Sequence, residues 1–412
     1  MNSGNLFKTQ EPKVYYKSSE AMEEVVDHSI QLIVTSPPYG KIKDYGNQKQ
    51  IGFFGTFDDY FERLKQVWSE CYRVLEPQCR MVINIGDQYL RTSEFGRYRV
   101  LSIASKIITD CLDLGFDFLG DIIWQKISTT NTTGGCTLMG SIYYPRNGLL
   151  TYDYEHILIF KKYQGKNKRK VDPIIKEMSK IPLSEWKKWY TGHWKFPGVV
   201  QKEHVAMFPE ELPHRIIRMF SYIGDTVLDP FLGSGTTLKV AKSLFRNGIG
   251  YELNIDYKKI VDNKVKNCKP GLFRDYQFIM YNLYEKARNE KIEIQIEKQK
   301  QKGVVFLKNA ENVEVILDYL LIEEEIFNQV KIKAEIDAKL KENTVLRYLE
   351  GILIDKKIKS YVILINSKFD KEIKLKQFLK AYLSKANLID KIKIITMDDF
   401  LLDDLNSSLF FL

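Results

Sequence analysis

Residues 226–237 most constrain the fold that this 412-residue chain can adopt. An apolar Thr-Val-Leu segment ends in Asp229, Pro-Phe-Leu-Gly-Ser-Gly-Thr-Thr follows it, and the apolar spacing of residues 238–245 then predicts a helix. A strand that ends in an acid and turns through two glycines into a helix lets bare backbone approach a ligand, because glycine has no Cβ atom. The stretch therefore predicts a nucleotide-type cofactor loop in an α/β sheet.

A second short element, Thr-Ser-Pro-Pro-Tyr at residues 35–39, follows an apolar run at 30–34 that predicts a central strand of a parallel sheet. Open α/β sheets place their chemistry at the carboxyl ends of such strands, which is where Ser36 lies. The two prolines lack N–H donors, so nearby carbonyls are left to accept hydrogen bonds. We expect this element to meet the loop at 229–237 in space.

Strands and helices alternate around these two elements. Strands are expected at 14–17, 80–85, 118–124, 154–161 and 248–251, and helices at 20–26, 57–75, 101–112 and 212–220. The alternation predicts a parallel, doubly wound α/β sheet. Glu252, at the tip of the strand after the glycine loop, is suitably placed for the ribose hydroxyls of a nucleoside cofactor. Because the element with Ser36 precedes the cofactor loop at 229–237 in the chain, we expect a circularly permuted, Rossmann-like sheet.

Residues 128–200 interrupt this rhythm and lie where the chain carries its positive charge. The chain holds 62 Lys and Arg against 53 Asp and Glu, and residues 125–202 hold 14 against 5, which leaves 48 of each elsewhere. Basic and aromatic residues alternate there, as expected for a surface that holds phosphates and bases. The alternatives are a solvated basic run and aromatic residues that pack a small core of their own. The basic residues expected to contact nucleic acid are Arg146, Lys161, Lys168, Arg169 and Lys170.

The remaining composition argues against several classes of protein. No apolar run reaches the roughly 18 to 20 residues of a membrane span, and residues 1–13 lack the apolar core of a signal peptide, so a cytoplasmic protein without membrane contact is expected. The five cysteines include no C-x-x-C pair, and the histidines show no ligand spacing. Neither a disulfide framework nor a metal site is predicted.

The last part of the chain is expected to be separate. Residues 284–302 predict a charged helical connector, and residues 303–412, with 17 basic and 18 acidic side chains, a small α/β domain without charge bias toward DNA. Strands are expected there at 304–307, 361–365 and 392–395, and helices at 311–327 and 372–386. Glu335, Asp337 and Lys339 loosely resemble a nuclease cluster, a spacing that is common by chance.

The order of these motifs resembles the beta group of DNA amino-methyltransferases, which are commonly partners of restriction endonucleases. The resemblance covers about residues 14–265 and rests on residues 35–39, the basic insertion, Phe208-Pro209, residues 229–237 and Glu252, in that order. It implies S-adenosylmethionine as the cofactor and double-stranded DNA as the substrate, with the target base flipped out of the duplex. It also implies a cognate restriction endonuclease in the same system, without stable binding.

The resemblance assigns roles to individual residues. It implies that Ser36 and the Pro37 carbonyl accept the hydrogens of the target amino group, that Pro38 belongs to the same catalytic loop and that Tyr39 stacks on the base. The implied cofactor residues are Asp229, Phe231, Gly233, Ser234, Gly235, Thr236, Thr237, Glu252 and Phe208. Ser18 stands where the family often has an acid, so a family contact from that position is in doubt.

The target and its alternatives follow from the same loop. Ser-Pro-Pro-Tyr is most frequent in cytosine-N4 enzymes, whereas adenine-N6 enzymes most often have Asp or Asn in place of the serine, so Ser36 favours cytosine. Adenine-N6 methylation stays open. An RNA or protein-amide methyltransferase and a non-catalytic DNA-binding protein are less favoured, because the basic insertion argues against the first and the intact loops against the second.

The resemblance and the composition together predict five segments. They are a catalytic half of the methyltransferase domain at 1–127, a target-recognition insertion at 128–200, a cofactor-binding half at 201–283, the connector at 284–302, and a small C-terminal α/β domain of unknown role at 303–412.

Overall fold

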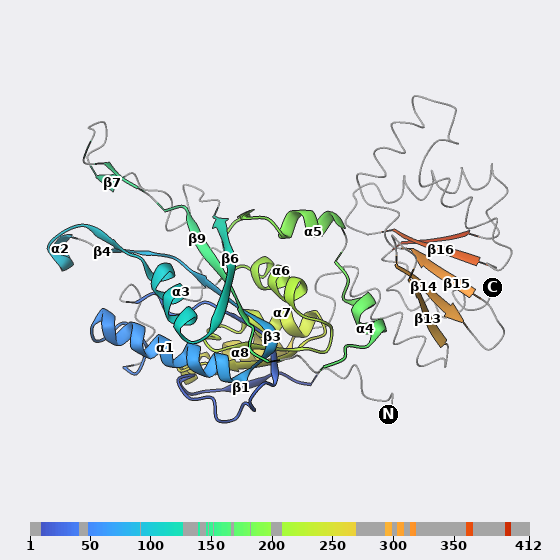
Figure 1. Cartoon of the computed structure of the whole chain (residues 1–412), viewed down its shortest axis with the longest axis horizontal. Helices are drawn as coiled ribbons and strands as arrows, with labels where there is room; N and C mark the ends of the chain where they lie inside the picture. Colours follow the sequence, from blue (N-terminus) through green and yellow to red (C-terminus); the bar gives the residue numbers. More distant parts are fainter. Residues whose placement is uncertain are drawn as a thin grey trace. The chain divides into compact units, whose positions relative to one another are not determined.

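A computed structural model gives the structure of the chain (Figure 1). It describes residues 10–40, 48–90, 92–126, 139–140, 146, 148–150, 152–165, 169–181, 183–198 and 208–268, and five strands beyond them. The chain forms two compact units, one of residues 1–171 and 185–273 and the other of residues 172–184 and 274–412. None of the described helices is long and apolar enough to cross a membrane.

An eight-stranded sheet forms the centre of the first unit, in the order β1-β12-β11-β2-β3-β9-β6-β10. Neighbouring strands run parallel, except that β9 is antiparallel to both β3 and β6. The strands are β1 (Lys13–Tyr15), β2 (Ile30–Thr35), β3 (Leu75–Ile85), β6 (Phe116–Gln125), β9 (Tyr154–Lys162), β10 (His193–Lys195), β11 (Thr226–Asp229) and β12 (Asn247–Tyr251).

The expected all-parallel sheet is therefore corrected to a mixed one. The chain leaves β6 at Gln125 and re-enters the neighbouring strand at Tyr154, and these two residues are paired partners. A connection that returns on the same edge of a sheet reverses the strand direction, whereas a parallel pair needs a crossover. The α/β class itself is confirmed, and the circular permutation stays a prediction.

Helix α1 (Phe57–Val74) begins where a helix start signal stands in the sequence. The Thr56 hydroxyl accepts a hydrogen bond from the Asp59 N–H at 3.1 Å, and the Asp59 carboxylate accepts one from the Thr56 N–H at 2.9 Å. One helix face then fills the core with Tyr60, Phe61, Leu64, Val67, Trp68, Cys71 and Val74. This helix packs against α3 (Ile103–Asp113), which contacts β6 and β9.

A second group of helices comprises α6 (Glu211–Phe220), α7 (Thr236–Ser243) and α8 (Lys258–Lys266). Helix α7 packs against α6, α8, β11 and β12, and α6 packs against β2 and β3. Every residue of β2 except Gln31 is buried. The sheet is thus covered on both faces at its centre, as expected for an apolar parallel strand.

The helix expected at residues 20–26 is wrong, because this segment forms turns. Side chains of α1 hold its backbone: Glu70 accepts from the Met22 N–H at 2.7 Å, and Arg73 donates to the Met22 carbonyl at 2.9 Å. Backbone groups engaged by another helix are not available for the hydrogen bonds of a local helix.

Short elements complete the described part of the first unit. They are β4 (Gln88–Leu90), α2 (Thr92–Phe95), β5 (Arg99–Leu101), β7 (Met139–Gly140), β8 (Gly148–Leu149) and the 3-10 helix η3 (Ile255–Tyr257). Helix α5 (Leu183–Trp189) begins in the segment 172–184 of the second unit and continues into the first. Strands β4 and β5 form one antiparallel hairpin, and β7 and β8 another.

The second unit contains α4 (Pro173–Met178) and a five-stranded sheet in the order β13-β14-β15-β16-β17. Strand β14 runs antiparallel to both of its neighbours, β13 and β15, whereas β15, β16 and β17 run parallel. The strands are β13 (Glu293–Lys298), β14 (Gly303–Lys308), β15 (Glu314–Asp318), β16 (Ser360–Ile365) and β17 (Ile392–Thr396).

The three strands expected in this unit are confirmed as β14, β16 and β17. The helix expected at 311–327 is wrong at β15, and the helical connector is wrong at β13, where the Glu-Ile-Gln-Ile-Glu alternation has the period of a strand. The helix expected at 372–386 and the triad Glu335, Asp337 and Lys339 lie outside the described residues.

Candidate active site

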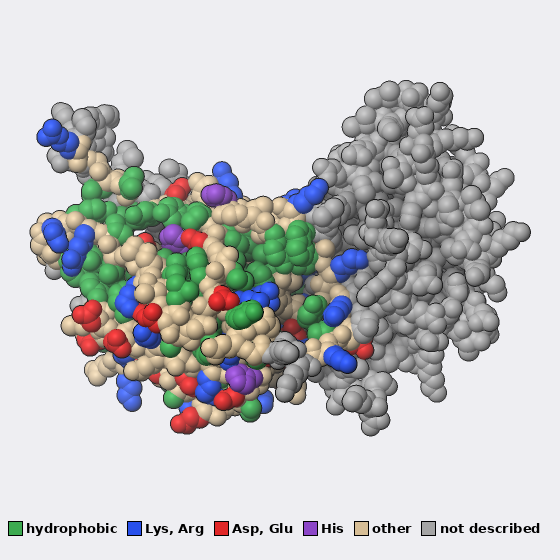
Figure 2. Space-filling view, in the orientation of Figure 1, with side chains coloured by type: hydrophobic (Ala, Val, Ile, Leu, Met, Phe, Trp, Pro, Cys, Tyr) green, Lys and Arg blue, Asp and Glu red, His purple; other side chains and the backbone are tan. Residues whose placement is uncertain are grey.

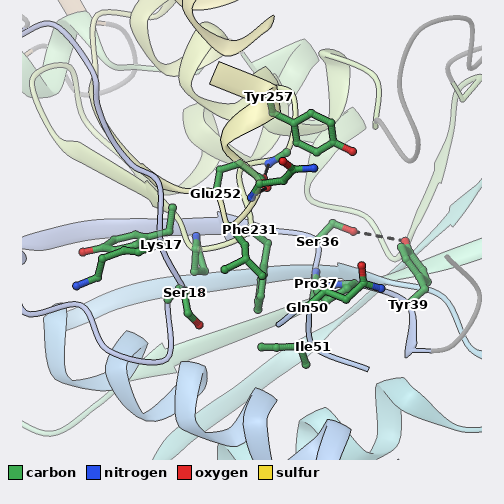
Figure 3. Close-up of a pocket in the computed structure, with 17 residues that line it drawn as sticks. Lys17, Ser18, Ser36, Pro37, Tyr39, Gln50, Ile51, Phe231, Glu252 and Tyr257 are labelled. Atoms are coloured by element: carbon green, nitrogen blue, oxygen red, sulfur yellow. Dashed lines mark hydrogen bonds between the residues drawn. The ribbon is translucent and has the colours of Figure 1, made fainter. Parts of the chain in front are cut away.

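A pocket lies at the carboxyl ends of β2, β11 and β12, at the edge where open α/β sheets bind their ligands (Figure 3). Both predicted loops line it. The target loop contributes Ser36, Pro37, Pro38 and Tyr39, and the glycine loop contributes Pro230, Phe231 and Gly233. Strands β2 and β11 are neighbours in the sheet, with Leu32 paired to Val227, and this brings the two loops together.

Asp229 joins the two loops beneath the pocket. Its side chain is fully buried, and it accepts hydrogen bonds from Thr35 Oγ1 at 2.7 Å, Thr237 Oγ1 at 2.6 Å and the Phe231 N–H at 3.0 Å. Burial raises the pKa of the Asp229 carboxyl to about 6, although these three donors act in the opposite direction. The carboxylate therefore fastens the end of β2 to the start of α7.

Glu252 lies in the pocket directly after β12. Its carboxylate accepts hydrogen bonds from the Gly233 N–H and the Asn254 N–H, both at 2.8 Å. Burial raises the pKa of Glu252 to about 7, more than the backbone donors lower it. An acceptor held in this way at the pocket wall can receive hydroxyl groups of a ligand.

The glycine loop is shaped to admit a ligand close to its backbone. Gly233 has a φ of 54° and Gly235 a φ of 87°, the left-handed region that favours glycine. A Cβ atom built on Gly233 would have no heavy atom within 4 Å, so the loop is open at this position. The residues present thus fit a nucleoside cofactor, with bare backbone and a carboxylate acceptor on one wall of the pocket.

The target loop is anchored from α1. The Pro38 carbonyl accepts hydrogen bonds from the Tyr60 hydroxyl at 2.8 Å and from the Gly40 N–H at 3.0 Å. No described residue donates to the Pro37 carbonyl. Ser36 Oγ lies 3.5 Å from the Tyr39 hydroxyl (Figure 3). The loop therefore presents one carbonyl and one hydroxyl as acceptors beside the pocket.

Sequence reasoning missed part of the pocket wall. The additional lining residues are Lys17, Ser19, Gln50, Ile51, Tyr251, Leu253, Asn254 and Tyr257, and Ser18, where a family contact was in doubt, lines the pocket as well. Several of these follow the carboxyl ends of β1 and β12, and the rule that located Ser36 could have located them. Gln50 and Ile51 had no such signal, because a long-range contact places them.

That contact is made by Arg63 of α1. Its guanidinium binds the Glu20 carboxylate through two nitrogens, each at 2.7 Å, and donates to the Lys49 and Gln50 carbonyls at 2.9 and 3.1 Å. The paired guanidinium holds the pKa of Glu20 below its usual range. One side chain thus ties together two segments that line the pocket.

The other predicted cofactor residues do not line this pocket. Asp229, Ser234, Gly235, Thr236 and Thr237 are buried in the loop and the first turn of α7, and Phe208, before α6, is half-buried. Lys264 of α8 donates to Ser234 Oγ at 2.7 Å and to Thr236 Oγ1 at 3.2 Å. These hydroxyls support the loop, and a direct cofactor contact from this set stays a prediction.

The predicted DNA-binding residues do not share one surface. Because β9 is antiparallel to β3, its first residues lie at the pocket edge, whereas Lys161 pairs with Arg80 toward the opposite edge. Arg169 forms an ion pair with buried Asp225, and Lys170, though exposed, follows the same far end of β9. Lys168 lies outside the described residues.

The connection that carries Arg146 leaves β6 and re-enters β9 at the pocket edge, where Gln125 and Tyr154 are paired. The hairpin of β4 and β5 also leaves from this edge, after β3, and carries the exposed side chains of Arg97 and Arg99. Figure 2 shows Lys and Arg side chains at two protruding tips on the left, over the positions of β7 and of α2 and β4 in Figure 1. Sequence reasoning missed this second arm, which lies outside the basic segment.

Known proteins that resemble this chain in sequence and structure are DNA methylases. The sequence pattern of the DNA methylase family, which covers N6 and N4 enzymes, matches residues 30–263. Type II methyltransferase M.MjaI of Methanocaldococcus jannaschii is 35% identical over 301 residues, which are 66% of this chain and 97% of the relative. Type II methyltransferase M.MthZI of Methanothermobacter thermautotrophicus is 33% identical over 277 residues, 61% of this chain and 76% of the relative.

Among solved structures, TTHA0409 of Thermus thermophilus, named as a DNA modification methylase and complexed with S-adenosyl-L-methionine, is 30% identical with a TM-score of 0.52. The match covers 63% of this chain and 96% of TTHA0409. The chain thus belongs to the DNA methylase family, as an S-adenosylmethionine-dependent amino-methyltransferase of the beta group and of the restriction-modification type.

Proposed function

We propose that this chain methylates the exocyclic N4 of cytosine within a short recognition sequence of double-stranded DNA. The observation that carries the proposal is that Ser36, the first residue of Ser-Pro-Pro-Tyr, lines the same pocket as Phe231, Gly233 and Glu252. Methyl donor and target amino group can therefore be held side by side. Adenine-N6 methylation is the alternative within the family.

The proposed chemistry depends on the state of the amino nitrogen. Its lone pair is delocalised into the ring, so the site must hold the nitrogen in line and localise the pair. Ser36 Oγ and the Pro37 carbonyl accept the amino hydrogens, and Tyr39 stacks on the base. S-adenosylmethionine, when bound, supplies an electrophilic methyl group on its sulfonium. No strong base is needed beforehand, because the acidic proton exists only after transfer and then leaves to solvent.

The cofactor half of the site is proposed to act by position. Glu252 receives the ribose hydroxyls, and Gly233 allows the backbone to approach the cofactor. Arg63 keeps the segments around Ser19 and Gln50 in place along the opposite wall. Asp229 stabilises the junction of the two loops, since its side chain is buried beneath the pocket.

For DNA, we propose that the two arms at the pocket edge hold the duplex while the target base is flipped toward Ser36. Arg146 on one arm and Arg97 and Arg99 on the other are exposed cations suited to phosphates. We also propose that a cognate endonuclease acts in the same system without stable binding and that the sheet is circularly permuted. The five predicted segments are kept as a proposal, except that β13 of the segment 284–302 belongs to the five-stranded sheet.

The direct test is Ser36→Ala, with cofactor affinity and methyl transfer measured separately. We expect cofactor binding to change less than twofold and methylation of DNA to fall at least 100-fold, since loss of one positioned hydrogen-bond partner of a reacting group costs about 10²–10³ in rate. A matched control is Ser102→Ala, whose hydroxyl instead contacts Asp87 at 3.2 Å. Full activity of Ser36→Ala would overturn the role of this residue.

A further inference from the structure

A chain of polar contacts extends from the target loop along the pocket edge of the sheet. Asn84 Nδ2 donates to Glu155 Oε2 at 2.8 Å and lies 3.5 Å from the Tyr39 hydroxyl. The second oxygen of Glu155 accepts from Lys126 Nζ. Since Tyr39 also lies 3.5 Å from Ser36 Oγ, this network reaches the proposed site of methyl transfer.

Strand pairing explains why these residues meet. Thr35 pairs with Ile83 of β3, so Asn84, the next residue of β3, lies beside Ser36, and the reversed direction of β9 brings Glu155 to the same edge. A Cβ atom on Gly86 would lie 3.3 Å from Glu155 Cγ and 3.4 Å from Tyr39 Cε1. A glycine at this position therefore lets the two side chains approach the Asn84 amide.

The amide of Asn84 has an acceptor that is not used. Its side chain is 2% exposed, and Oδ1 has no hydrogen-bond partner among the described residues. The orientation of the amide follows from Glu155, because a carboxylate can only accept and so the NH₂ group must face it. A buried acceptor without a partner is unfavourable, so a donor is expected to reach it in the working complex.

A second unused acceptor lies near the same loop. Gln88 Oε1 belongs to a side chain that is 5% exposed and also has no partner among the described residues. It would lie 2.8 Å from a Cβ atom on Gly40, the residue that follows Tyr39. Two buried amide oxygens therefore adjoin the target loop, which points to a ligand that brings hydrogen-bond donors.

We propose that Asn84 reads the Watson–Crick edge of the flipped base, and that Glu155 is the positioning residue that holds its amide. When the base enters and Tyr39 moves onto it, Oδ1 accepts from the exocyclic amino group, and the second hydrogen of Nδ2 is donated to the adjacent ring nitrogen. This inference rests on the proposed amino-methyltransferase function. An amino hydrogen can be shared between two acceptors, so the contact is compatible with those of Ser36 and Pro37.

The donor and acceptor pattern selects a class of base. Cytosine and adenine both present an amino group next to an unprotonated ring nitrogen, which complements one amide. Thymine and guanine present a carbonyl next to a ring N–H, which places acceptor against acceptor and donor against donor. Asn84 would thus restrict the pocket to amino-bearing bases, whereas Ser36 acts on the nitrogen itself.

The test compares duplexes that differ only at the mapped target base, which carries its amino group or has hydrogen in its place. The full chain is used with S-adenosylhomocysteine present. We expect the wild-type protein to bind the amino-bearing duplex more tightly, by at least the 3–10-fold ratio of about one neutral hydrogen bond. Asn84→Leu should reduce this ratio about 3-fold or more, leaving the share of Ser36 and the Pro37 carbonyl, and lower kcat/KM at least 10-fold, with cofactor affinity unchanged.

Two further variants separate positioning from general damage. Glu155→Leu should behave as Asn84→Leu, whereas Glu155→Gln can still offer one oxygen to Asn84 and should keep most of the ratio. Gln125→Leu is the matched control, because it removes another amide-carboxylate contact of this edge, Gln125 Nε2 to Asp153 Oδ2 at 2.8 Å. A full ratio in a folded, cofactor-binding Asn84→Leu protein would overturn the inference. Absence of any methylation by the wild-type chain would instead overturn the proposed function.

Discussion

Removal of a single hydroxyl beneath the pocket gives the sharpest stability prediction. Thr35→Val keeps the shape of the side chain and deletes the 2.7 Å hydrogen bond to Asp229, a group that no water reaches because its side chain is fully buried. A hydrogen bond to a charged group contributes about 1.5–3 kcal/mol and one between neutral groups about 0.5–1.5 kcal/mol. The stability that Thr35→Val removes therefore depends on whether the Asp229 carboxyl is ionised.

The pKa of Asp229 decides where that change occurs. This pKa is raised from 3.8 to about 6 in the folded protein, so between these two pH values the folded state binds more protons than the unfolded state. The free energy of unfolding therefore falls by about 3 kcal/mol as pH rises from about 4 to about 6. At pH 8 the carboxylate is charged, and Thr35→Val should cost about 1.5–3 kcal/mol. At pH 5 the folded-state carboxyl is mostly protonated, and the cost should drop to about 0.5–1.5 kcal/mol.

Urea unfolding followed by tryptophan fluorescence measures this difference, because all five tryptophans lie in the first compact unit. Thr237→Val, which removes the 2.6 Å bond to the other carboxylate oxygen, should show the same pH dependence. Thr109→Val, at an exposed bond to the Ser105 carbonyl, should stay within about 0.5 kcal/mol of the wild type. An equal cost of Thr35→Val at both pH values, or none, would refute this account of Asp229.

Three further predictions concern ligands. Glu252→Gln should weaken cofactor binding about 10–100-fold. Because ligand hydroxyls favour the ionised carboxylate, the affinity of the wild-type protein for the cofactor should also rise as pH increases through about 7. Calorimetry at several pH values should find no such rise in the variant. Arg63→Met should weaken cofactor binding about 3–10-fold by releasing the segments at Glu20 and Gln50, whereas Arg80→Met, outside the pocket wall, should not. Joint replacement of Arg97, Arg99 and Arg146 by alanine should reduce the steepness with which the DNA association constant falls with salt, by up to about 2.7 in the log–log slope, at roughly 0.9 per phosphate contact. An equal reduction of this slope on replacing Lys170, Lys187 and Lys188 would contradict the assignment of the arms.

The parts of the fold that follow from local patterns were predictable. The apolar runs at β2 and β11, the helical spacing of α1 and the glycine loop each express short-range rules, and all of them are found in the structure. The meeting of the two loops followed from one further rule, that carboxyl ends of parallel strands share an edge.

The parts that depend on long-range contacts were not predictable from local patterns. The direction of β9 depends on which strands it pairs with. Because it runs antiparallel to β3, Lys161 lies toward the edge of the sheet opposite the pocket, and not beside Arg146 as the DNA-binding prediction implied. Gln50 enters the pocket wall because Arg63 holds it, and Pro38 is fixed by Tyr60. At β13, the charge of the side chains obscured a period-two alternation.

The measurement that tests the central claim most directly is the identity of the methylated nucleoside. Duplex DNA is incubated with the full chain and S-adenosylmethionine, digested to nucleosides and analysed by mass spectrometry, with Ser36→Ala as the paired control. We expect N4-methylcytosine in the wild-type reaction and at least 100-fold less with the variant. N6-methyladenine instead would contradict the choice of base, and the absence of any methylated nucleoside across a diverse set of duplexes would contradict the proposed activity.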